Sequence, residues 1–461
     1  MKNIDENRIL NLLINAKQAS PDNIETILAK SKSLQRLTLE ETATLLAAED
    51  PETKEKIFQA AAHVKDAIYG KRIVLFAPLY INNYCANNCV YCAFRSDNAL
   101  IERKALTVKE IKEEVEWMLK RGHKRILMVA GEAPPPHQKL IDYYVNAIET
   151  IYSAQVGPHK IKRVNINCAP LEIDEFKRLK SAGIGTFQIF QETYHEQTYK
   201  LVHPRGPKSD PDNRLNAVDR AFAAGIDDVG VGVLYGLYDY KFDTLAMLMH
   251  IEYLESKFKV GPHTISVPRI EPAIGSAFSE NIPYKVSDED FKKIVAVVRL
   301  SVPYTGIILS TRESSEMRDI LINLGVSQIS AESKTSPGGY SEKEEKPSGQ
   351  FSLSDQRSLD EVVDSLLNHG LIPSFCAACY RKERTGEKFM NLAKPGTIKD
   401  MCQINALLTL KEYLEDFASE KVKTEGNDLV ERLSEKLSGK DKTVLNKLFD
   451  CVNRGERDKY V

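Results

Sequence analysis

Short apolar runs alternate with amphipathic helical patterns through the middle of the chain, from residue 71 to residue 335. Eight runs have the apolar, β-branched character of buried strands: 73–78, 125–130, 162–168, 186–191, 228–234, 264–270, 306–310 and 326–330. Helical patterns separate most of them: 108–121, 140–153, 173–182, 214–224, 245–258, 288–300 and 315–324. Near-continuous apolar strands joined by helices predict a parallel sheet. Eight such units predict an α/β fold, a (β/α)8 TIM-type barrel, with its active site at the C-terminal ends of the strands.

The segments on either side of this barrel have different patterns. Residues 1–70 contain amphipathic helical stretches without a chemical motif, which predicts an N-terminal helical extension. Residues 336–358 are rich in Ser, Gly, Lys and Glu and are predicted to form a polar loop or linker. Residues 359–461 have mostly helical spacing and contain four cysteines, three of which form a group, which predicts a mostly helical C-terminal iron–sulfur domain.

Composition narrows the class of protein without identifying it. The chain has 461 residues, which is enough for one large domain and a smaller one. It is 42% hydrophobic and 28% charged, with a net charge of −2. The balanced charge gives no indication of a nucleic-acid or membrane partner. No run approaches the ~20 apolar residues of a membrane helix, and the first residues lack a signal-peptide pattern, so we expect a cytoplasmic protein. Six of the eight cysteines fall in two groups, which indicates metal binding rather than disulfides.

The first group, Cys85, Cys89 and Cys92, forms a C-x3-C-x2-C motif directly after the first predicted strand. Three thiolates can hold three irons of a cubane 4Fe–4S cluster, which leaves the fourth iron open to a small molecule. Electron-transfer clusters are usually saturated by cysteine, so an open iron predicts chemistry at the cluster itself. The alternative is a zinc site with a fourth ligand elsewhere, although zinc sites usually close with paired C-x2-C units.

This motif at the end of a first barrel strand resembles the signature of radical S-adenosylmethionine (radical SAM) enzymes. The resemblance implies that S-adenosylmethionine (SAM) binds the open iron through its amino and carboxylate groups. It also implies that the reduced cluster cleaves SAM to a 5′-deoxyadenosyl radical, which removes a hydrogen atom from the substrate. By position, the resemblance assigns five further residues to SAM binding: Tyr91, Gly131, Glu132, Glu192 and Arg214. Asn165 and Asn167 are two further candidates, from their positions on one strand.

These seven assignments differ in strength. The run that ends in Gly131 and Glu132 resembles the GGE motif of the superfamily, with Ala130 in place of the first glycine. Taken alone, a strand-end glutamate or a helix-start arginine is typical of a surface salt bridge. The cysteine motif in the same chain strengthens the assignment of Glu192 and Arg214 to SAM binding. Asn165 and Asn167 alternate on one strand and share a face, so they either bind ribose or adenine or bond to neighbouring strands.

Four further stretches resemble the aromatic-amino-acid lyases of this superfamily: residues 190–199, 206–210, 213–215 and 229–239. This group includes the tyrosine lyase of thiamine thiazole biosynthesis and the tyrosine lyases that mature FeFe-hydrogenase. The resemblance implies cleavage of the Cα–Cβ bond of L-tyrosine, which releases p-cresol and dehydroglycine.

The second cysteine group, Cys376, Cys379 and Cys402, has the spacing C-x2-C-x22-C and predicts a second 4Fe–4S cluster with an open iron. The thiazole enzyme lacks this motif, whereas the hydrogenase maturases have it at this spacing. The resemblance therefore implies that dehydroglycine breaks into carbon monoxide and cyanide at the second cluster, to give an iron–carbonyl–cyanide unit for hydrogenase assembly. A structural zinc site, or a cluster that only rigidifies the domain, is the alternative.

His263 is assigned by the same resemblance as a ligand of a labile fifth iron. In this family a bridging sulfur amino acid joins that iron to the second cluster. We expect this amino acid to be free cysteine. Imidazole is a suitable ligand for ferrous iron. Because the sixth predicted strand starts at this point, His263 is expected at the opposite end of the barrel from Cys85.

The substrate tyrosine needs a cation for its carboxylate. Arg312, after the seventh strand, is the first candidate because a guanidinium can bind a carboxylate through two hydrogen bonds. Arg269 is the second candidate, with Glu271 as its alternative partner, and the strand-end hydroxyls that can assist are Ser310, Thr311 and Ser330. Other expected partners are an electron donor such as flavodoxin or ferredoxin and other hydrogenase maturases. A 2-iminoacetate synthase for thiamine synthesis and a non-enzymatic iron–sulfur scaffold are the alternative functions.

Overall fold

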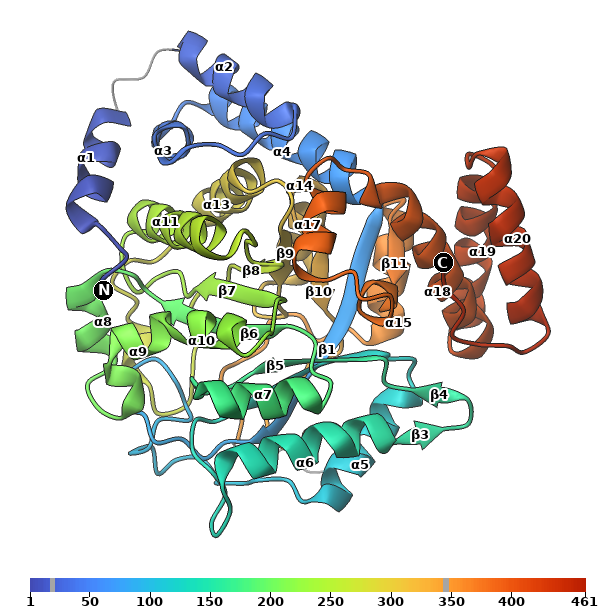
Figure 1. Cartoon of the computed structure of the whole chain (residues 1–461), viewed down its shortest axis with the longest axis horizontal. Coiled ribbons are helices and arrows are strands. Elements are labelled where there is room, and N and C mark those ends of the chain that lie inside the picture. Colours follow the sequence, from blue (N-terminus) through green and yellow to red (C-terminus); the bar gives the residue numbers. More distant parts are fainter. Residues whose placement is uncertain (17–20, 343–347) are drawn as a thin grey trace.

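A closed barrel of eight parallel strands forms the centre of the computed structural model, which describes residues 1–16, 21–342 and 348–461 (Figure 1). In barrel order the strands are β1 (Arg72–Asn82), β2 (Arg125–Ala130), β5 (Arg163–Asn167), β6 (Phe187–Glu192), β7 (Val229–Val233), β8 (Thr264–Ser266), β9 (Gly306–Leu309) and β10 (Gln328–Ser330). Residues Val74–Phe76 of β1 pair with β10 and close the barrel. The predicted (β/α)8 barrel is confirmed, and each barrel strand overlaps a predicted run.

Helices surround the barrel because their apolar faces pack on the outward side chains of the strands. They are α5 (Val108–Leu119), α6 (Leu140–Ser153), α7 (Ile173–Ser181), α10 (Ala217–Ala223), α11 (Tyr240–Phe258), α13 (Asp288–Ser301) and α14 (Ser315–Leu324). The predicted helix 214–224 is two helices, α9 (Pro211–Leu215) and α10, because Asp210 caps an earlier start with proline in the first turn. Shorter helical pieces are α8 (Glu196–Val202), a 3₁₀ turn η1 (Pro207–Ser209) and α12 (Ala277–Glu280).

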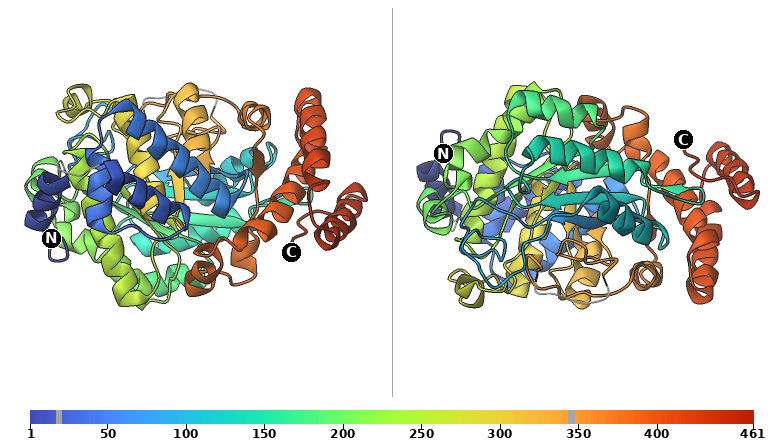
Figure 2. Two further views of the ribbon diagram at one scale, coloured as in Figure 1. Left: turned by 90° about the horizontal axis from the view of Figure 1, so that it is seen from above. Right: turned by 90° about the horizontal axis from the view of Figure 1, so that it is seen from below.

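Four N-terminal helices lie against α11 and α13, on one side of the barrel (Figures 1 and 2). They are α1 (Glu6–Ala16), α2 (Pro21–Lys32), α3 (Leu39–Ala47) and α4 (Pro51–Tyr69). In α4, five apolar side chains that face the barrel are fully buried: Ile57, Ala60, Ala61, Val64 and Ile68. The extension therefore shares a hydrophobic core with the barrel.

The C-terminal part of the chain joins the barrel through a short strand that the sequence did not indicate. Strand β11 (Ile372–Ser374) pairs in parallel with Arg72–Val74, at the start of β1. The helices of this part are α15 (Leu359–Asn368), α16 (Ala378–Arg381), α17 (Gly386–Ala393), α18 (Ile398–Asp416), α19 (Glu420–Ser434) and α20 (Gly439–Asn453). Helices α19 and α20 lie on the opposite side of the molecule from α1 (Figures 1 and 2).

The connection between α6 and β5 contains an element that the sequence did not indicate. A small hairpin of β3 (Gln155–Val156) and β4 (His159–Lys160) follows α6. No helix of the described residues is long and apolar enough to cross a membrane.

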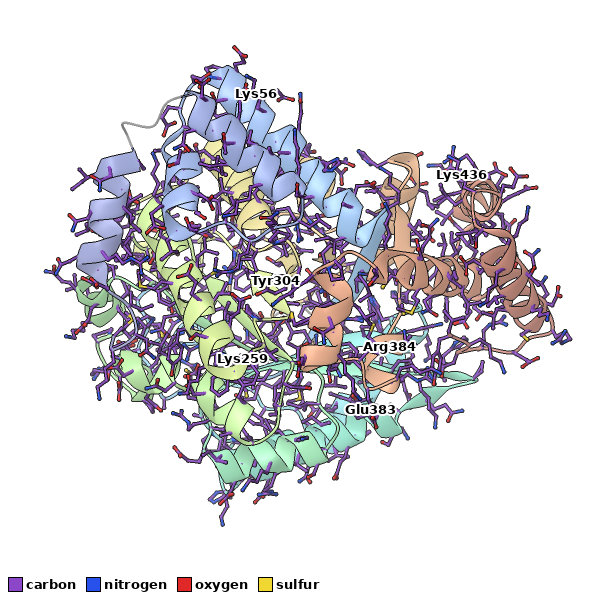
Figure 3. All side chains as sticks on the ribbon, turned by 45° about the horizontal axis from the view of Figure 1, so that its top comes forward. Lys56, Lys259, Tyr304, Glu383, Arg384 and Lys436 are labelled. Carbon is purple, nitrogen blue, oxygen red and sulfur yellow. The ribbon has the colours of Figure 1, made fainter. Side chains whose placement is uncertain are left out.

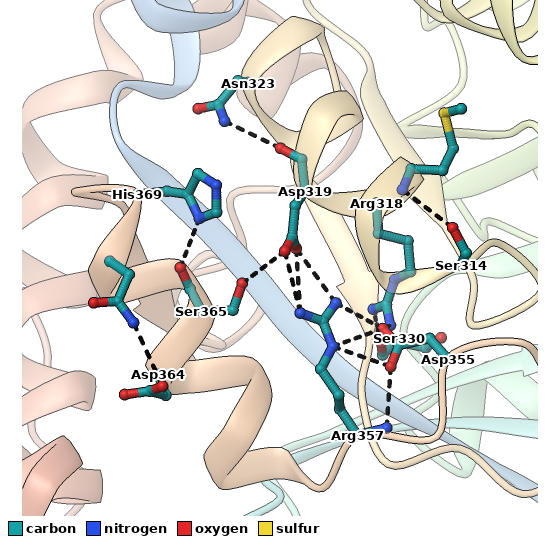
Figure 4. Close-up of polar contacts among 12 residues, drawn as sticks. Ser314, Arg318, Asp319, Asn323, Ser330, Asp355, Arg357, Asp364, Ser365 and His369 are labelled. Carbon is teal, nitrogen blue, oxygen red and sulfur yellow. Dashed lines mark hydrogen bonds and ion pairs between the residues drawn. The ribbon is translucent and has the colours of Figure 1, made fainter.

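Residues 348–357, which we call the covering segment, form the second part of the predicted polar loop; residues 343–347 lie outside the described structure. Asp355 is held at the barrel by the buried guanidinium of Arg318 and by Arg357, whose Nη2 lies 2.7 Å from an Asp355 carboxylate oxygen. Arg357 also pairs with Asp319 on α14 at 3.3 Å (Figure 4). This network places the covering segment across the C-terminal ends of the strands.

Candidate functional site

The three cysteines of the C-x3-C-x2-C motif lie in the loop that follows β1. They are free thiols and line one cavity at the C-terminal ends of the strands, the first cavity, whose volume of about 1400 Å³ includes space open to solvent. Burial raises the pKa of Cys85, Cys89 and Cys92, in the case of Cys92 to about 11. Such thiols ionise readily only beside a strong positive charge, which iron supplies.

Two glycines allow the cysteine loop to pack closely against neighbouring loops. A Cβ atom at Gly131, directly after β2, would lie 2.1 Å from the carbonyl oxygen of Tyr84. A Cβ atom at Gly206 would lie 2.5 Å from the carbonyl oxygen of Ala86, and Gly206 has φ +94°, a conformation that favours glycine. The loop that holds the thiols therefore depends on two positions without side chains.

Asn87, inside the cysteine loop, connects it to the charged groups of the cavity. Its side-chain NH2 donates to Glu132 Oε2 at 2.6 Å, and its Oδ1 accepts from the backbone N–H of Lys208 at 2.8 Å. The cysteine loop, the end of β2 and the turn after α8 therefore form one hydrogen-bonded unit.

Two buried ion pairs lie in this cavity beside the thiols. Arg214 Nη1 is 2.7 Å from Glu132 Oε1, and Lys208 Nζ is 2.6 Å from Glu192 Oε1. Burial acts to raise the pKa of Glu132, but Arg214 and Lys208 lower it below its usual value. Burial and Arg214 act to lower the pKa of Lys208, but Glu192 and other acidic groups raise it. Glu132, Arg214 and Lys208 are therefore charged near neutral pH, and the cavity has groups of both charges beside the thiols.

Glu192 reaches the cavity through an unusual backbone conformation. It ends β6 after a register shift between Phe190 and Glu192, and its φ is +71°. A non-glycine residue in this region costs about 1–3 kcal/mol, and such residues concentrate at functional sites. Arg214 Nε donates to the carbonyl oxygen of Phe190 at 2.6 Å, which stabilises the same irregular strand end.

Tyr91 also lines the first cavity, and His203 fixes its orientation. Burial lowers the pKa of His203 well below its ordinary value, so the imidazole is neutral. His203 Nδ1 lies 2.9 Å from the carbonyl oxygen of Tyr199, so this nitrogen carries the hydrogen. Nε2 then accepts from the hydroxyl of Tyr91 at 2.8 Å.

The two asparagines of β5 occupy different depths of the barrel. Asn167 lines the first cavity. Asn165 lies two residues earlier on β5. Its Oδ1 accepts from Arg163 Nε and from the backbone N–H of Thr186, each at 3.0 Å. Of the two, the structure brings only Asn167 to the predicted SAM site, and Asn165 bonds to neighbouring groups.

Arg312 lies in the first cavity with Ser310, Thr311 and Ser330. Its guanidinium carbon lies 3.3 Å from the centre of the Phe351 ring. Among the described residues, this guanidinium has no hydrogen-bond or ion-pair partner, so it is available for a carboxylate. Burial lowers the pKa of Arg312. An arginine guanidinium nevertheless stays protonated in proteins.

Arg269, which was predicted as a second substrate residue, does not line this cavity. Its guanidinium is bound by Glu313 and, at 2.8 Å, by Asp288, rather than by Glu271. Glu271 itself lines the first cavity. The ion pairs use the hydrogen-bonding groups that a substrate carboxylate would need.

The covering segment closes over this site and contributes residues that the sequence did not single out. Gln350 Oε1 accepts from the hydroxyl of Tyr80 at 2.8 Å, which directs Gln350 Nε2 toward Cys92 Sγ at 3.7 Å. Phe351 covers Arg312 from the same segment. Lys208 and His203 were also missed, because single polar residues in loops have no periodic or motif signal.

The second cysteine group lies at the other end of the barrel. Cys376, Cys379 and Cys402 line a cavity of about 450 Å³, the second cavity, together with strand-start residues such as Arg125 and Gln328. Helix α16 supplies Cys379 and helix α18 supplies Cys402. A hydrogen bond between these two thiols and the charge of Arg72 lower the pKa of Cys402, while the same hydrogen bond raises that of Cys379. Figure 3 shows the neighbouring Arg384 in this part of the chain.

His263 lines this second cavity, at the opposite end of the barrel from Cys85. Its Nδ1 lies 3.8 Å from Asp228 Oδ2, and its Nε2 lies 3.5 Å from the hydroxyl of Tyr380. Burial lowers the pKa of His263, which favours the neutral imidazole that binds metals.

The donor atoms of both cavities suit iron–sulfur clusters. Each cavity has three free thiols, and the second also has cationic groups whose buried nitrogens, Arg72 Nε and Arg125 Nε, have no partner in the described structure. Among the described residues, no group of three or more His, Cys, Asp or Glu side chains is arranged to hold a single metal ion. The fit is therefore one of donor chemistry: thiolates for iron, and cations for the negative charge of a thiolate-bound cluster.

Comparisons with known proteins agree with this geometry. Residues 79–250 match the model of the radical SAM superfamily, and residues 266–372 match that of the biotin and thiamin synthesis associated domain. The chain is 32% identical to 2-iminoacetate synthase of Salmonella typhimurium, over 79% of this chain and 92% of the relative.

Two solved structures extend the similarity to the C-terminal part. The crystal structure of HydG, a maturase of the FeFe-hydrogenase, is 48% identical, with a TM-score of 0.96 and complete coverage of both chains. The structure of HydG from Carboxydothermus hydrogenoformans is 41% identical, with a TM-score of 0.84 over 96% of this chain and 97% of that one.

The fold and the first thiol group define a radical SAM enzyme. Within that class, the chain belongs to the tyrosine lyase group of the radical SAM superfamily, with HydG, the FeFe-hydrogenase maturase, as its structural neighbour.

Proposed function

We propose that this enzyme cleaves the Cα–Cβ bond of L-tyrosine to p-cresol and dehydroglycine, and converts dehydroglycine to carbon monoxide and cyanide for FeFe-hydrogenase assembly. One observation supports this two-stage reaction most strongly: two groups of three thiols line cavities at opposite ends of one barrel. The names of the similar proteins, 2-iminoacetate synthase and FeFe-hydrogenase maturase, correspond to the two stages.

At the first cavity, Cys85, Cys89 and Cys92 would hold the 4Fe–4S cluster. When bound, the cluster and SAM supply a radical that removes a hydrogen atom from the substrate. Glu132 and Glu192 are suited to the SAM amino group, and Arg214 and Lys208 to its carboxylate, because these charges already lie together in the cavity. Tyr91 and Asn167 would contact the nucleoside part.

Arg312 would bind the carboxylate of tyrosine, since it has no partner among the described residues and lies in the same cavity as the thiols. Ser310, Thr311 and Ser330 are available to assist, and Ser330 Oγ is buried without a described partner. The covering segment would exclude water from the reacting groups, because Gln350 and Phe351 lie over them.

At the second cavity, Cys376, Cys379 and Cys402 would hold the second cluster, and His263 would bind a labile fifth iron attached through a bridging cysteine. The linings of the two cavities approach each other on β1. Phe76 lines the first and Val74 lines the second, and residues two apart on a strand are separated by about 7 Å. Dehydroglycine could thus pass between them without leaving the protein.

We also propose a cytoplasmic location, reduction by a small electron donor such as flavodoxin or ferredoxin, and transfer of the product to other hydrogenase maturases. The second candidate function is 2-iminoacetate synthesis alone, which the 32% identity to that enzyme favours. The second thiol group, in a cavity with His263, favours the two-stage reaction over it.

The test is anaerobic reconstitution with iron and sulfide, followed by incubation with tyrosine, SAM and dithionite. We expect 5′-deoxyadenosine, p-cresol and carbon monoxide from the wild type, and none of them from Cys89→Ser. Formation of p-cresol without carbon monoxide would instead identify a 2-iminoacetate synthase. Absence of both 5′-deoxyadenosine and p-cresol would leave an iron–sulfur scaffold.

A further inference from the structure

Three arginines stand at the starts of adjacent barrel strands, around the second cavity: Arg72 on β1, Arg125 on β2 and Arg163 on β5. Arg163 has partners within the protein. Its Nε donates to Asn165 at 3.0 Å, its Nη2 lies 3.4 Å from Asp228 Oδ2, and its guanidinium stacks on the ring of Tyr380 at 2.8 Å.

Arg72 and Arg125, in contrast, retain unused hydrogen-bond donors inside the second cavity. Arg72 makes no side-chain hydrogen bond or ion pair with any residue of the described structure, and its Nε is buried. Arg125 is 6% exposed; its Nη1 donates to the carbonyl oxygen of Cys376 at 2.6 Å, and its Nε is buried without a partner. Unpaired buried donors of this kind are costly and rare, which indicates that a ligand normally satisfies them.

The charge of the cavity leads to the same conclusion. Its described lining residues include two arginines but no aspartate or glutamate. In its oxidised state a cubane core bound by three thiolates has a net charge of about −1, against about +2 from the two guanidiniums, so a further anion would balance the cavity in that state. A guanidinium matches a carboxylate through two parallel hydrogen bonds, and this geometry is specific to arginine.

We propose that Arg72, supported by Arg125, is the carboxylate-binding element of the second cavity, and that its ligand is a small α-amino or α-imino acid. This proposal rests on the proposed function for the presence of such an acid. Two sources have the same carboxylate chemistry: the free sulfur amino acid that bridges the fifth iron, and the dehydroglycine that arrives from the first cavity.

The first experiment measures binding by equilibrium dialysis under anaerobic conditions, with the reconstituted full-length protein and radiolabelled L-cysteine or cysteamine, which lacks the carboxylate. Because hydrogen bonds to charged groups are stronger than neutral ones, we expect the wild type to prefer L-cysteine by roughly 10- to 100-fold. Arg72→Gln should abolish this preference, and Arg72→Lys, which retains the charge without the planar fork, should reduce it.

The second experiment measures carbon monoxide per p-cresol in the same proteins. If Arg72→Gln retains the preference for cysteine but forms at least 10-fold less carbon monoxide per p-cresol, the carboxylate belongs to dehydroglycine. Failure of the wild type to form p-cresol would refute the proposed function, while the cysteine–cysteamine comparison would still test Arg72.

Arg381→Gln is the matched control. Arg381 is two residues from Cys379, but it pairs with Asp458 at 2.5 Å, does not line the second cavity and should behave as wild type in both experiments. Iron content and the electron paramagnetic resonance (EPR) signal of each variant report whether both clusters are present. If Arg72→Lys has full iron content and neither the preference nor the product ratio changes, Arg72 only balances the charge of the cluster, and the proposal is wrong.

Discussion

Single residues determine the geometry of the first cavity, and Gly131 is the clearest example. The Cβ that any other residue would add at this position lies 2.1 Å from a backbone oxygen of the cysteine loop. The backbone of that loop would have to move, and the thiols would move with it.

We therefore expect Gly131→Ala to destabilise the protein by about 1–3 kcal/mol, the usual cost of overpacking, and to lower the iron content of the first cluster. Gly439→Ala is the control, because a Cβ there has no atom within 4 Å and lies at the start of a helix. Urea unfolding and iron analysis measure both effects. Equal stability and equal iron content in the two variants would contradict this account.

Asp243 supports the irregular end of β6 from α11. Its Oδ1 accepts from the backbone N–H of Tyr194 at 2.7 Å and from Thr193 Oγ1 at 3.0 Å, while its Oδ2 is buried without a described partner. Burial raises the pKa of Asp243 from 3.8 to about 7. Between these values the folded protein retains a proton that the unfolded chain has lost, so this group stabilises less as pH rises from about 4 to about 7.

Asp243→Asn removes this titration. We expect the stability of the variant relative to the wild type to increase by about 2–4 kcal/mol from pH 4 to pH 7.5, in proportion to the pKa shift. The comparison is made within one pH series of urea unfolding, because other groups titrate in both proteins. A constant difference between the two proteins across this range would show that Asp243 titrates normally.

At the level of elements, the barrel strands and most helices could be predicted because each repeats a hydrophobic pattern over several residues. Strand β11 could not, since its three residues include a proline and its pairing with β1 depends on a contact about 300 residues away in sequence. The loop 336–358 was recognised from its polar composition, but composition does not indicate what a loop covers. The roles of Gln350 and Phe351 over the first cavity follow only from the structure.

The covering segment depends on one buried ion pair. Arg318 and Asp355 have side chains that are each 1% exposed, whereas Arg357 and Asp319 are 20% and 28% exposed. Removing one partner of a buried pair leaves an uncompensated charge and costs about 3–5 kcal/mol, whereas a partly exposed pair contributes about 1 kcal/mol or less.

We expect Asp355→Ala to destabilise the protein by about 3–5 kcal/mol and to weaken tyrosine binding, since the covering segment lies over Arg312. Asp319→Asn should cost less than about 1 kcal/mol and leave tyrosine binding unchanged. Urea unfolding and calorimetric titration with tyrosine measure these quantities. If the two variants are equally stable, the buried pair does not hold the segment.

At the scale of the whole molecule, one barrel holds two groups of thiols, one at each end. The cysteine spacings predicted both groups, and the resemblance to tyrosine lyases predicted that His263 would lie with the second. The sequence did not show that Arg72 and Arg125 keep free donors in the second cavity, because free donors depend on the absence of nearby acidic groups. Nor did it separate Arg269 from Arg312, which both follow barrel strands and differ only in their ion pairs.

The central claim is that the two cavities perform successive stages of one reaction. The direct test compares p-cresol and carbon monoxide from the wild type, the Cys376→Ser/Cys379→Ser variant and the control Cys451→Ser, which alters a cysteine of α20 outside both cavities. We predict that the double variant retains p-cresol formation and loses carbon monoxide, while the control forms both. Carbon monoxide at the wild-type ratio to p-cresol in the double variant would contradict the two-stage account.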